Sequence, residues 1–588
     1  MLKLFKYLKK RNYLFLIVAV GLIVLQVWLD LTFPDYTAKL TTLIAMESKV
    51  PGSLKISDIW YNGGMMLLCA AGSILAAIAC GFFTSRIAAD WSESLRNELF
   101  NKINSFSNAE MNKFTVPSLI TRTTNDVGHI QTFTAIGVQL LIKAPITAVW
   151  AILKISNKSM EWTLAIGITV GIIAVVVVLL TVFVVPKFKK IQKLTDDLND
   201  VTRENVSGVR VIRAFNAEDY QADKFEIVNN NVMKNQLFTG RMMGIILPFM
   251  QLTMNGLTIA IFWIGAYLIN KAQIFDKAVV FGNMTAFTQL AMQVVMSFMI
   301  LVMVFLILPR TIVAANRIKE VLKTNPSIKD GKNAKKNEIN EAINIVEFKN
   351  VSFSYNDDLS HSALINLDFK VKKGETVAII GATGSGKTTL ISLLSRYYDA
   401  TSGEVLINGK NVKDYSLDDL NSLISIATQK AVLFNGNIKE NITYGAKEFE
   451  QDRFNKAIEV SQSSFINELE EKEHSHVAQG GTNFSGGQKQ RLSIARCLYK
   501  DSDILIFDDT FSALDYKTDM LVRKGIKENY RDKTTFIVAQ RIGTIRYADK
   551  IIVIDEGRIQ GIGTHDELMK NCDVYRSIGL SQLSKEEL

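Results

Sequence analysis

Gly381-Ala382-Thr383-Gly384-Ser385-Gly386-Lys387-Thr388 has the spacing G-x-x-x-x-G-K-[ST]. An apolar run, Val377–Ile380, precedes it, and a helix-like run, Thr389–Tyr398, follows it. This strand–loop–helix context is the one in which the pattern binds phosphate, because the glycines allow a tight loop whose backbone N–H groups point inward. The helix N-terminus adds positive potential at the same place. The stretch therefore predicts an α/β domain that binds a nucleotide.

Two further side chains complete this predicted site. Lys387 can reach the β- and γ-phosphates of a nucleoside triphosphate, and the Thr388 hydroxyl can ligate Mg²⁺. Asp508 ends the apolar run Ile504–Phe507, and a carboxylate at the end of a buried strand suits the same ion. The expected cofactors are therefore a nucleoside triphosphate and Mg²⁺. The residues expected to bind the nucleotide here are Gly381, Thr383, Gly384, Ser385, Gly386, Lys387, Thr388 and Thr389.

A second phosphate-binding element follows about a hundred residues later. Ser485-Gly486-Gly487-Gln488 precedes the helix-like run Leu492–Tyr499. Serine and two glycines ahead of a helix make another anion-binding terminus. A chain with two such elements can use both internally or lend one to a partner, and spacing alone leaves both readings open.

Composition places a membrane part beside this soluble part. The 588 residues are 48% hydrophobic yet 21% charged, which is too apolar for a typical soluble enzyme and too charged for a chain lying wholly in lipid. Residues 1–340 carry a net charge of +14 and residues 341–588 a net charge of −5. The basic residues of the first part flank long apolar runs, which indicates a lipid bilayer and argues against nucleic acid. The apolar content excludes a disordered chain, and four cysteines exclude a disulfide scaffold.

Six apolar runs approach the ~20 residues that a helix needs to cross a hydrocarbon core. They are Tyr13–Phe33, Trp60–Phe83, Thr132–Ile155, Trp162–Val185, Met243–Ile269 and Ala278–Leu308. Basic residues precede the first run and follow the fourth, so we expect the N-terminus and the long segments after runs two and four to be cytoplasmic. The predicted fold is an all-α transmembrane domain of six long helices extending into the cytosol (1–322), a linker (323–340) and an α/β P-loop NTPase domain (341–588).

Two features of the membrane part are candidates for substrate contact. Met292, Met296, Met299 and Met303 recur at helical spacing on one face, and methionine suits surfaces that repack around varied apolar ligands. Ordinary helix packing or lipid contact is the alternative. Asp30, near the outer end of the first run, is expected to pair with a cationic substrate if it faces a cavity, or to be a solvated acid at the interface.

The order of the motifs resembles the ATP-binding-cassette (ABC) family, and the six runs resemble its exporter half-transporters. The resemblance rests on the phosphate loop, Gln429, Ser485–Gln488, Asp508 and Ser512–Asp515, and it covers nearly the whole chain. It implies that two cassettes pair head to tail, with each ATP lying between the phosphate loop of one chain and Ser485–Gln488 of the other.

The resemblance also implies roles for single residues and segments. Tyr355 would stack on adenine, and Gln429 would sense Mg²⁺ and contact the membrane domain. Asp515 would lie in the loop that crosses the interface between cassettes. Segments near 117–122 and 217–225 would be the coupling helices that dock on the cassettes.

Two positions depart from the family pattern. The residue after the Mg²⁺-binding Asp508 is usually Glu, which polarises the attacking water, and here it is Asp509. The usual switch histidine is replaced by Gln540. A shorter carboxylate and an uncharged amide both impair hydrolysis and leave nucleotide binding intact. The pattern resembles the degenerate-site subunit of heterodimeric exporters, which implies a second, non-identical half-transporter. A homodimer with two slow sites is the alternative.

Together these features imply ATP-driven efflux of amphipathic or drug-like molecules across the plasma membrane. Asp509, Gln540 and Gln429 are the expected catalytic positions, and Thr388, Gln429 and Asp508 are the expected Mg²⁺ ligands. A dedicated lipid, peptide or haem exporter with the same ATPase is one alternative function. An ATP-gated regulator or channel with no pumped substrate is another, from a different class.

Overall fold

The computed structural model describes residues 2–47, 55–156, 160–273, 276–331, 344–355 and 362–582. The chain divides into two compact units, which are considered separately below. Unit 1 comprises Met1–Asn104 and Val116–Thr324, and unit 2 comprises Ser105–Thr115 and Asn325–Leu588. The second half of the expected linker, residues 332–340, lies outside the described residues.

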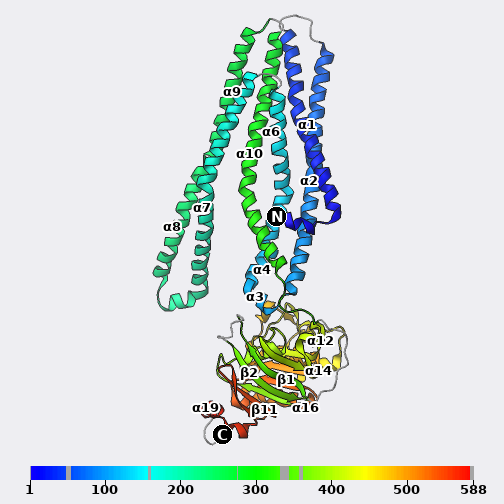
Figure 1. The fold of residues 1–588 in the computed structure, drawn as a ribbon, viewed down its shortest axis with the longest axis vertical. Coiled ribbons are helices and arrows are strands. Elements are labelled where there is room, and N and C mark those ends of the chain that lie inside the picture. The colour runs from blue at the N-terminus through cyan, green and yellow to red at the C-terminus, as the bar shows by residue number, and fades with distance from the viewer. Residues whose placement is uncertain are drawn as a thin grey trace. The chain divides into compact units, whose positions relative to one another are not determined.

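The described residues of unit 1 form helices joined by short connections (Figure 1). The helices are η1 (Leu2–Tyr7), α1 (Lys10–Glu47), α2 (Ile56–Asn104), α4 (Val116–Thr123), α5 (Asn125–Thr132), the π-helical turn η2 (Phe133–Gly137), α6 (Val138–Ser156), α7 (Met160–Ala214), α8 (Glu218–Gly244), α9 (Ile246–Lys271) and α10 (Asp276–Lys323). Long uninterrupted apolar stretches favour helix here because in lipid every backbone group must find its partner within the segment.

Among the described residues of unit 1, five helical segments are long and apolar enough to cross a membrane. They are Lys10–Glu47, Ile56–Asn104, Val116–Ser156, Glu218–Lys271 and Asp276–Lys323, and five of the six predicted runs lie in them. The fourth run falls on α7, whose apolar helix over Met160–Val176 is shorter than a span requires within the described residues. The helical character of the membrane part is therefore confirmed, while the number of six spans is not.

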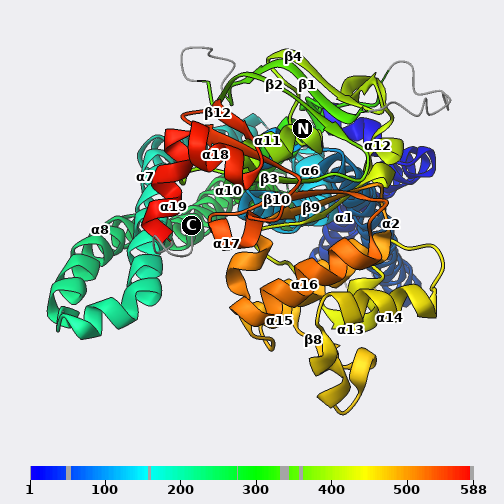
Figure 2. The ribbon, with the colours of Figure 1, turned by 90° about the horizontal axis from the view of Figure 1, so that it is seen from below.

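The core of unit 1 lies where α1 packs on α2, α6 and α10. Ile23, Val27 and Leu31 of α1 recur every four residues and are almost completely buried. Phe287 and Leu290 of α10 belong to the same hydrophobic cluster. Helices α7 and α8 run side by side as an antiparallel pair, as Figures 1 and 2 both show.

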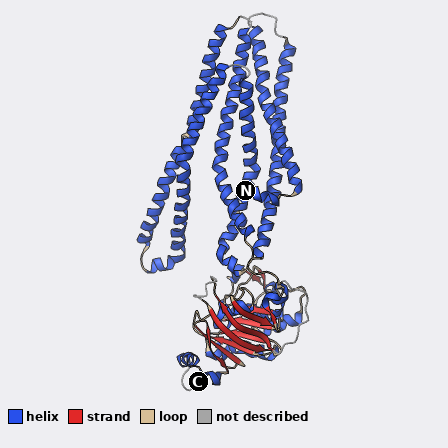
Figure 3. Ribbon diagram, in the orientation of Figure 1, coloured by secondary structure: helices blue, strands red, loops and turns tan. Residues whose placement is uncertain are grey.

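Unit 2 is built on two main sheets (Figure 3). The first has the order β12-β11-β3-β10-β9-β6; its neighbours pair in parallel except at β12. The second has the order β2-β1-β4-β5 and is antiparallel. The strands are β1 (Asn344–Phe353), β2 (Leu364–Lys372), β3 (Thr376–Ile380), β4 (Ser402–Ile407), β5 (Lys410–Asn411), β6 (Ile424–Ala427), β7 (Gly436–Asn437), β8 (His476–Val477), β9 (Ile504–Asp508), β10 (Thr534–Val538), β11 (Lys550–Asp555) and β12 (Arg558–Gly563).

The central sheet is buried on both faces, which explains why its strands are continuous apolar runs. Val377 and Ile379 of β3 belong to a cluster with the antiparallel sheet and α11, whereas Ala378 and Ile380 belong to the cluster on the helical side. Side chains of a strand alternate between faces, so one five-residue run contributes to both cores. Figure 2 shows these layers, with α15 and α16 on one side of the sheet and β1, β2 and β4 on the other.

The helices of unit 2 cover these faces. They are α3 (Asn108–Phe114), α11 (Lys387–Leu394), α12 (Leu417–Leu423), α13 (Ile438–Ile442), α14 (Gln451–Val460), α15 (Gly486–Lys500), α16 (Tyr516–Asn529), α17 (Ile542–Ile545), α18 (His565–Asn571) and α19 (Asp573–Gln582). The predicted order of a helical membrane part followed by an α/β domain is confirmed.

Helix α3 belongs to unit 2 although its sequence lies inside the membrane part. The buried carboxylate of Glu110 accepts from the backbone N–H of Ser327 at 3.1 Å. The Ser107 and Ser327 hydroxyls lie 2.8 Å apart, and Asn112 donates to the Tyr398 hydroxyl at 3.1 Å. These polar contacts explain why a seven-residue helix is held within the second unit.

Candidate nucleotide site

The phosphate loop connects β3 to α11 within unit 2. Gly384 and Gly386 have φ angles of 83° and 107°, a backbone region that other residues rarely adopt. A Cβ added to Gly386 would also lie 2.6 Å from a methyl carbon of Leu364. The glycines at these two positions are therefore required by conformation and, at Gly386, by space.

Lys387 opens α11 and is 8% exposed. Its ammonium donates to the carbonyl oxygens of Gly381 and Ala382 at 2.9 and 2.7 Å. Burial lowers the pKa of this amine, while the nearby carboxylates of Asp508 and Asp509 act in the opposite direction. The loop thus holds a desolvated ammonium, which phosphate oxygens would stabilise strongly.

Thr388 and Asp508 are brought together by the packing of α11 against β9. The Thr388 hydroxyl donates to the Asp508 carboxylate at 3.4 Å. Burial raises the pKa of Asp508, the Thr388 hydrogen bond lowers it, and neighbouring Asp509 raises it further. A hydroxyl and a carboxylate are hard oxygen ligands of the kind that Mg²⁺ takes beside nucleotide phosphates. These two residues therefore fit the expected ion.

The three expected catalytic positions meet at one carboxylate. Gln540 donates from Nε2 to Asp509 Oδ2 at 2.9 Å, and Gln429 donates from Nε2 to the same oxygen at 3.3 Å. Asp509 is 9% exposed and has a φ of 48°, which its short polar side chain tolerates better than most. Its backbone N–H donates to Val538 O at 3.0 Å, which ties the ends of β9 and β10 together. Two amides thus occupy one oxygen of Asp509.

Tyr355 follows the end of β1 and is 56% exposed. Its hydroxyl lies 2.9 Å from that of Thr389 in the first turn of α11. Phe353 and Tyr398 hold its ring through edge-on contacts, with centroids 4.9 and 5.2 Å away. The exposed ring therefore stands beside the start of α11, where a planar base can stack on it.

Ser485–Gln488 forms a separate turn at the start of α15. Ser485 Oγ accepts from the Gln488 N–H at 3.3 Å, and the Gln488 side chain accepts from the Ser485 N–H at 2.9 Å. This reciprocal pair is a capping box. Ser485 and Gly486 are exposed, and a Cβ added to Gly486 would meet no atom within 4 Å. The element is thus rigid, open and accessible to a ligand or a partner.

In unit 1, Asp30 is already engaged by three neighbouring helices. Lys143 of α6 donates to its carboxylate at 3.1 Å and Ser73 of α2 at 2.5 Å. Gln293 of α10 donates to the Asp30 carbonyl at 2.9 Å. Helix α1 continues beyond the predicted run to Glu47, so Asp30 lies within the helix.

A second ion pair joins the same two helices. Lys154 of α6 lies 2.6 Å from Asp35 of α1 and also donates to the Leu31 carbonyl at 2.7 Å. Sequence reasoning missed Lys143 and Lys154 as partners of these carboxylates. The signal was present, because charges inside apolar runs are expensive and seek each other, but spacing could not show which carboxylate each lysine meets.

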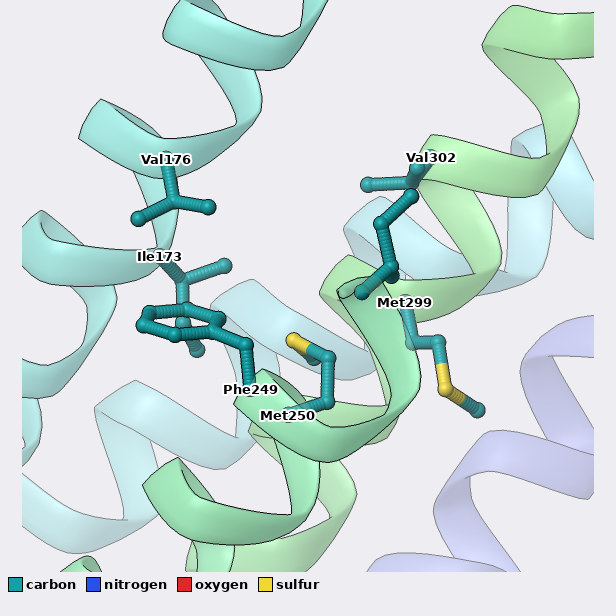
Figure 4. A pocket seen from close by; sticks show the side chains of 7 residues that line it. Ile173, Val176, Phe249, Met250, Met299 and Val302 are labelled. Carbon is teal, nitrogen blue, oxygen red and sulfur yellow. The ribbon is translucent and has the colours of Figure 1, made fainter. Parts of the chain in front are cut away.

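The predicted methionine face is divided by the structure. Met299 lines a small apolar cavity of about 20 Å³ with Met250, Phe249 and Ile173 (Figure 4). Met292, Met296 and Met303 are exposed on α10. The cavity has room for about one water molecule, so in this conformation it is a packing gap between α7, α9 and α10. Met299 thus combines core packing with a place on the methionine face.

Both units match models of known protein families. Residues 16–324 match the ABC transporter transmembrane region, and residues 364–512 match the ABC transporter family. The chain belongs to the ABC transporter family. The transporter is a multi-span membrane protein with a cytoplasmic ATPase domain, and it couples ATP hydrolysis to transport.

Relatives of the transporter span most of its length. An uncharacterized ABC transporter ATP-binding protein of Mycobacterium bovis is 35% identical over 524 residues, 88% of each chain. An ATP-dependent lipid A-core flippase of Syntrophus aciditrophicus is 32% identical over 526 residues, 88% of this chain and 84% of the flippase. A solved structure of a bacterial Atm1-family ABC exporter with ATP bound has a TM-score of 0.80 at 22% identity, covering 97% of this chain and 98% of that one. The transporter therefore has the fold of that exporter.

Proposed function

We propose that this transporter exports amphipathic, drug-like molecules as the degenerate-site half of a heterodimer. The observation that carries the proposal is the Asp509 carboxylate, which accepts from Gln540 and Gln429 through one oxygen. A general base must present a free oxygen to the attacking water. Asp509 is one methylene shorter than Glu, and two amide donors compete with water for one of its two oxygens, so we infer slow hydrolysis at this site.

Binding of ATP is proposed to remain intact. Lys387 and the loop glycines hold the phosphates, Thr388 and Asp508 with Gln429 hold Mg²⁺, and Tyr355 stacks on adenine. The ion would neutralise phosphate charge, as it does in other phosphate loops. The exposed Ser485–Gln488 turn would complete a second site on the non-identical partner, where hydrolysis is fast.

Movement of the ATPase domains is proposed to reach the membrane part through two coupling segments, near 117–122 and 217–225. The first coincides with α4, and the second begins α8. The segment Ser105–Thr115, which packs within the ATPase unit, directly precedes the first of them. We also propose six spans, with α7 as the fourth, and a substrate surface that includes the exposed methionines of α10.

A dedicated lipid exporter is the second candidate function. It is favoured by the 32% identity to a relative described as an ATP-dependent lipid A-core flippase. Transport assays in proteoliposomes distinguish the two candidates. A drug exporter would move a drug-like cation in an ATP-dependent way, whereas a lipid exporter would move a labelled phospholipid. If neither class of molecule moves or stimulates ATPase activity in the presence of the partner, the protein is better explained as an ATP-gated regulator.

The heterodimer proposal predicts little ATPase activity from this chain alone. The purified chain, reconstituted in nanodiscs, is expected to hydrolyse ATP at a rate close to that of its Lys387→Ala variant, which lacks the phosphate-binding ammonium. Phosphate release measured over a range of ATP concentrations checks this. A robust rate from the unaccompanied chain that Lys387→Ala abolishes would contradict the heterodimer reading and favour a competent homodimer.

The proposed adenine contact predicts a selective effect at Tyr355. Tyr355→Ala should weaken ATP binding about fivefold or more, because base–aromatic stacking is worth ~1–3 kcal/mol. Tyr355→Phe is the matched control, since it keeps the ring and loses only the hydroxyl contact with Thr389. Equilibrium binding at fixed Mg²⁺ measures both. Equal losses in the two variants would mean that the hydroxyl, and not the ring, makes the contribution.

A further inference from the structure

The last helix of the ATPase unit reaches the loop that carries Gln540. Helix α19 is anchored by Tyr575, which is completely buried and whose hydroxyl lies 2.9 Å from His565 Nδ1. At the other end of α19, Gln582 donates from Nε2 to the Gln540 carbonyl at 2.7 Å. Its Oε1 accepts from the Ile542 N–H at 2.9 Å. One side-chain amide therefore binds the backbone on both sides of Arg541. The two segments that it joins are at least 40 residues apart in the sequence.

This contact supplies a hydrogen-bond acceptor to a backbone N–H group that has none within its own helix. The Ile542 N–H is the first of the short helix α17, and the first N–H groups of a helix have no partner within it. The residue at the N-cap position is Arg541, whose side chain has no acceptor and makes no capping hydrogen bond. Gln582 supplies the missing acceptor from another helix and binds the preceding carbonyl at the same time. A two-point contact of this kind fixes orientation as well as distance.

The fixed backbone in turn determines where the Gln540 side chain lies relative to Asp509. The carbonyl that Gln582 holds belongs to the residue whose Nε2 donates to Asp509 at 2.9 Å. Rotation of this peptide would move the Gln540 side chain away from Asp509, whereas the phosphate loop between β3 and α11 makes its contacts independently. The geometry thus connects the C-terminal helix to one side of the nucleotide site.

We propose that Gln582 is a positioning residue for Gln540 and thereby for recognition of the γ-phosphate of ATP. The proposal deepens the proposed function and rests on it: Gln540 stands where the family's switch histidine contacts the γ-phosphate of ATP, and we place its amide beside that phosphate. It makes a specific distinction between nucleotides: ADP has no γ-phosphate, so its binding should not depend on Gln582. The C-terminal helix would then help the site to distinguish ATP from ADP.

The test compares nucleotide affinities of full-length variants in nanodiscs. Gln582→Met keeps the length of the side chain and removes both hydrogen bonds, while Gln582→Glu keeps an acceptor for Ile542 and turns a carboxylate toward the Gln540 carbonyl. Ser581→Ala is the matched control, because the Ser581 hydroxyl donates to the Ile578 carbonyl of its own helix and to no other group among the described residues. The dissociation constants of Mg²⁺ with AMP-PNP, a non-hydrolysable ATP analogue, and with ADP are measured together with the unfolding temperature.

Both Gln582 variants should raise the dissociation constant of AMP-PNP about tenfold or more, the scale of one hydrogen bond to a charged group. ADP affinity and the Ser581→Ala variant should be unchanged. Gln540→Ala should match Gln582→Met, and the double variant should be no worse than either single one. Unchanged AMP-PNP affinity, or equal losses for AMP-PNP and ADP with a lower unfolding temperature, would overturn the proposal. If Gln540→Ala itself leaves AMP-PNP affinity unchanged, the proposed place of Gln540 fails instead.

Discussion

Replacing Asp509 by Glu and Gln540 by His is expected to raise ATP turnover at the phosphate loop of this chain ~100-fold. A Glu side chain extends the carboxylate by one methylene toward the attacking water. In the structure both Gln540 and Gln429 donate to the same Asp509 oxygen, so lengthening the side chain also changes which donors it can meet. A histidine at position 540 adds a group that can carry charge near neutral pH.

The two substitutions should act as one unit. Asp509→Glu alone leaves the Gln540 amide in place, and Gln540→His alone leaves the short carboxylate, so each single variant should recover only part of the gain. Steady-state phosphate release from the purified, reconstituted chain measures all three. Adding Lys387→Ala to the double variant is the control, because a gain that belongs to this phosphate loop must then disappear. An unchanged rate in the double variant would show that another feature limits hydrolysis.

The sequence predicts those parts of the site whose residues are close together in the chain, and it predicts contacts between distant residues less well. The phosphate loop was predictable because its glycines, Lys387 and Thr388 are contiguous and lie between a strand and a helix. The fit of Asp508 beside Thr388 was predictable as well, since the carboxyl ends of parallel strands lie at one edge of a sheet. The contact of Gln582 with Gln540 was not, because no motif links a C-terminal helix to a loop at least 40 residues away.

The membrane part was predictable in character but less so in detail. Apolar runs predicted helices correctly, because hydropathy and length determine this outcome in lipid. Side-chain partners were harder to predict: Asp30 was expected to pair with a cationic substrate or to be a solvated acid, yet it pairs with Lys143 of α6. That pairing depends on how α1 rotates against α6, which the sequence of either helix alone does not contain.

The Asp30–Lys143 pair leads to the second large prediction. Asp30→Asn should destabilise unit 1 by about 3 kcal/mol, because it leaves the Lys143 ammonium without its counter-charge in a low-dielectric bundle. The value is taken at the low end of the range for buried pairs, since the two side chains are 27% and 23% exposed. Lys143→Met should lower the free energy of unfolding by a similar amount, because it leaves the Asp30 carboxylate without its counter-charge.

Removing both charges should restore most of the loss, since neither group is then buried without a partner. The unfolding temperature of Asp30→Asn/Lys143→Met in detergent micelles should therefore exceed that of either single variant by several degrees. Glu93→Gln is the matched control: its partner pair Lys9–Glu93 is 47% and 60% exposed and should contribute little.

Transport measurements separate the ion pair from a direct substrate contact. If Asp30 binds a cationic substrate, Asp30→Asn should reduce uptake of cations by inverted vesicles more than uptake of neutral molecules, and the double variant should not recover it. If Asp30 serves to neutralise Lys143, the double variant should recover transport of both classes together with stability. The hydrogen bond from Ser73 and the close approach of Lys143 favour the second outcome, because a substrate cation would have to displace an ammonium that the helix already holds in place. Wild-type stability in Asp30→Asn with a selective loss of cation transport would contradict it.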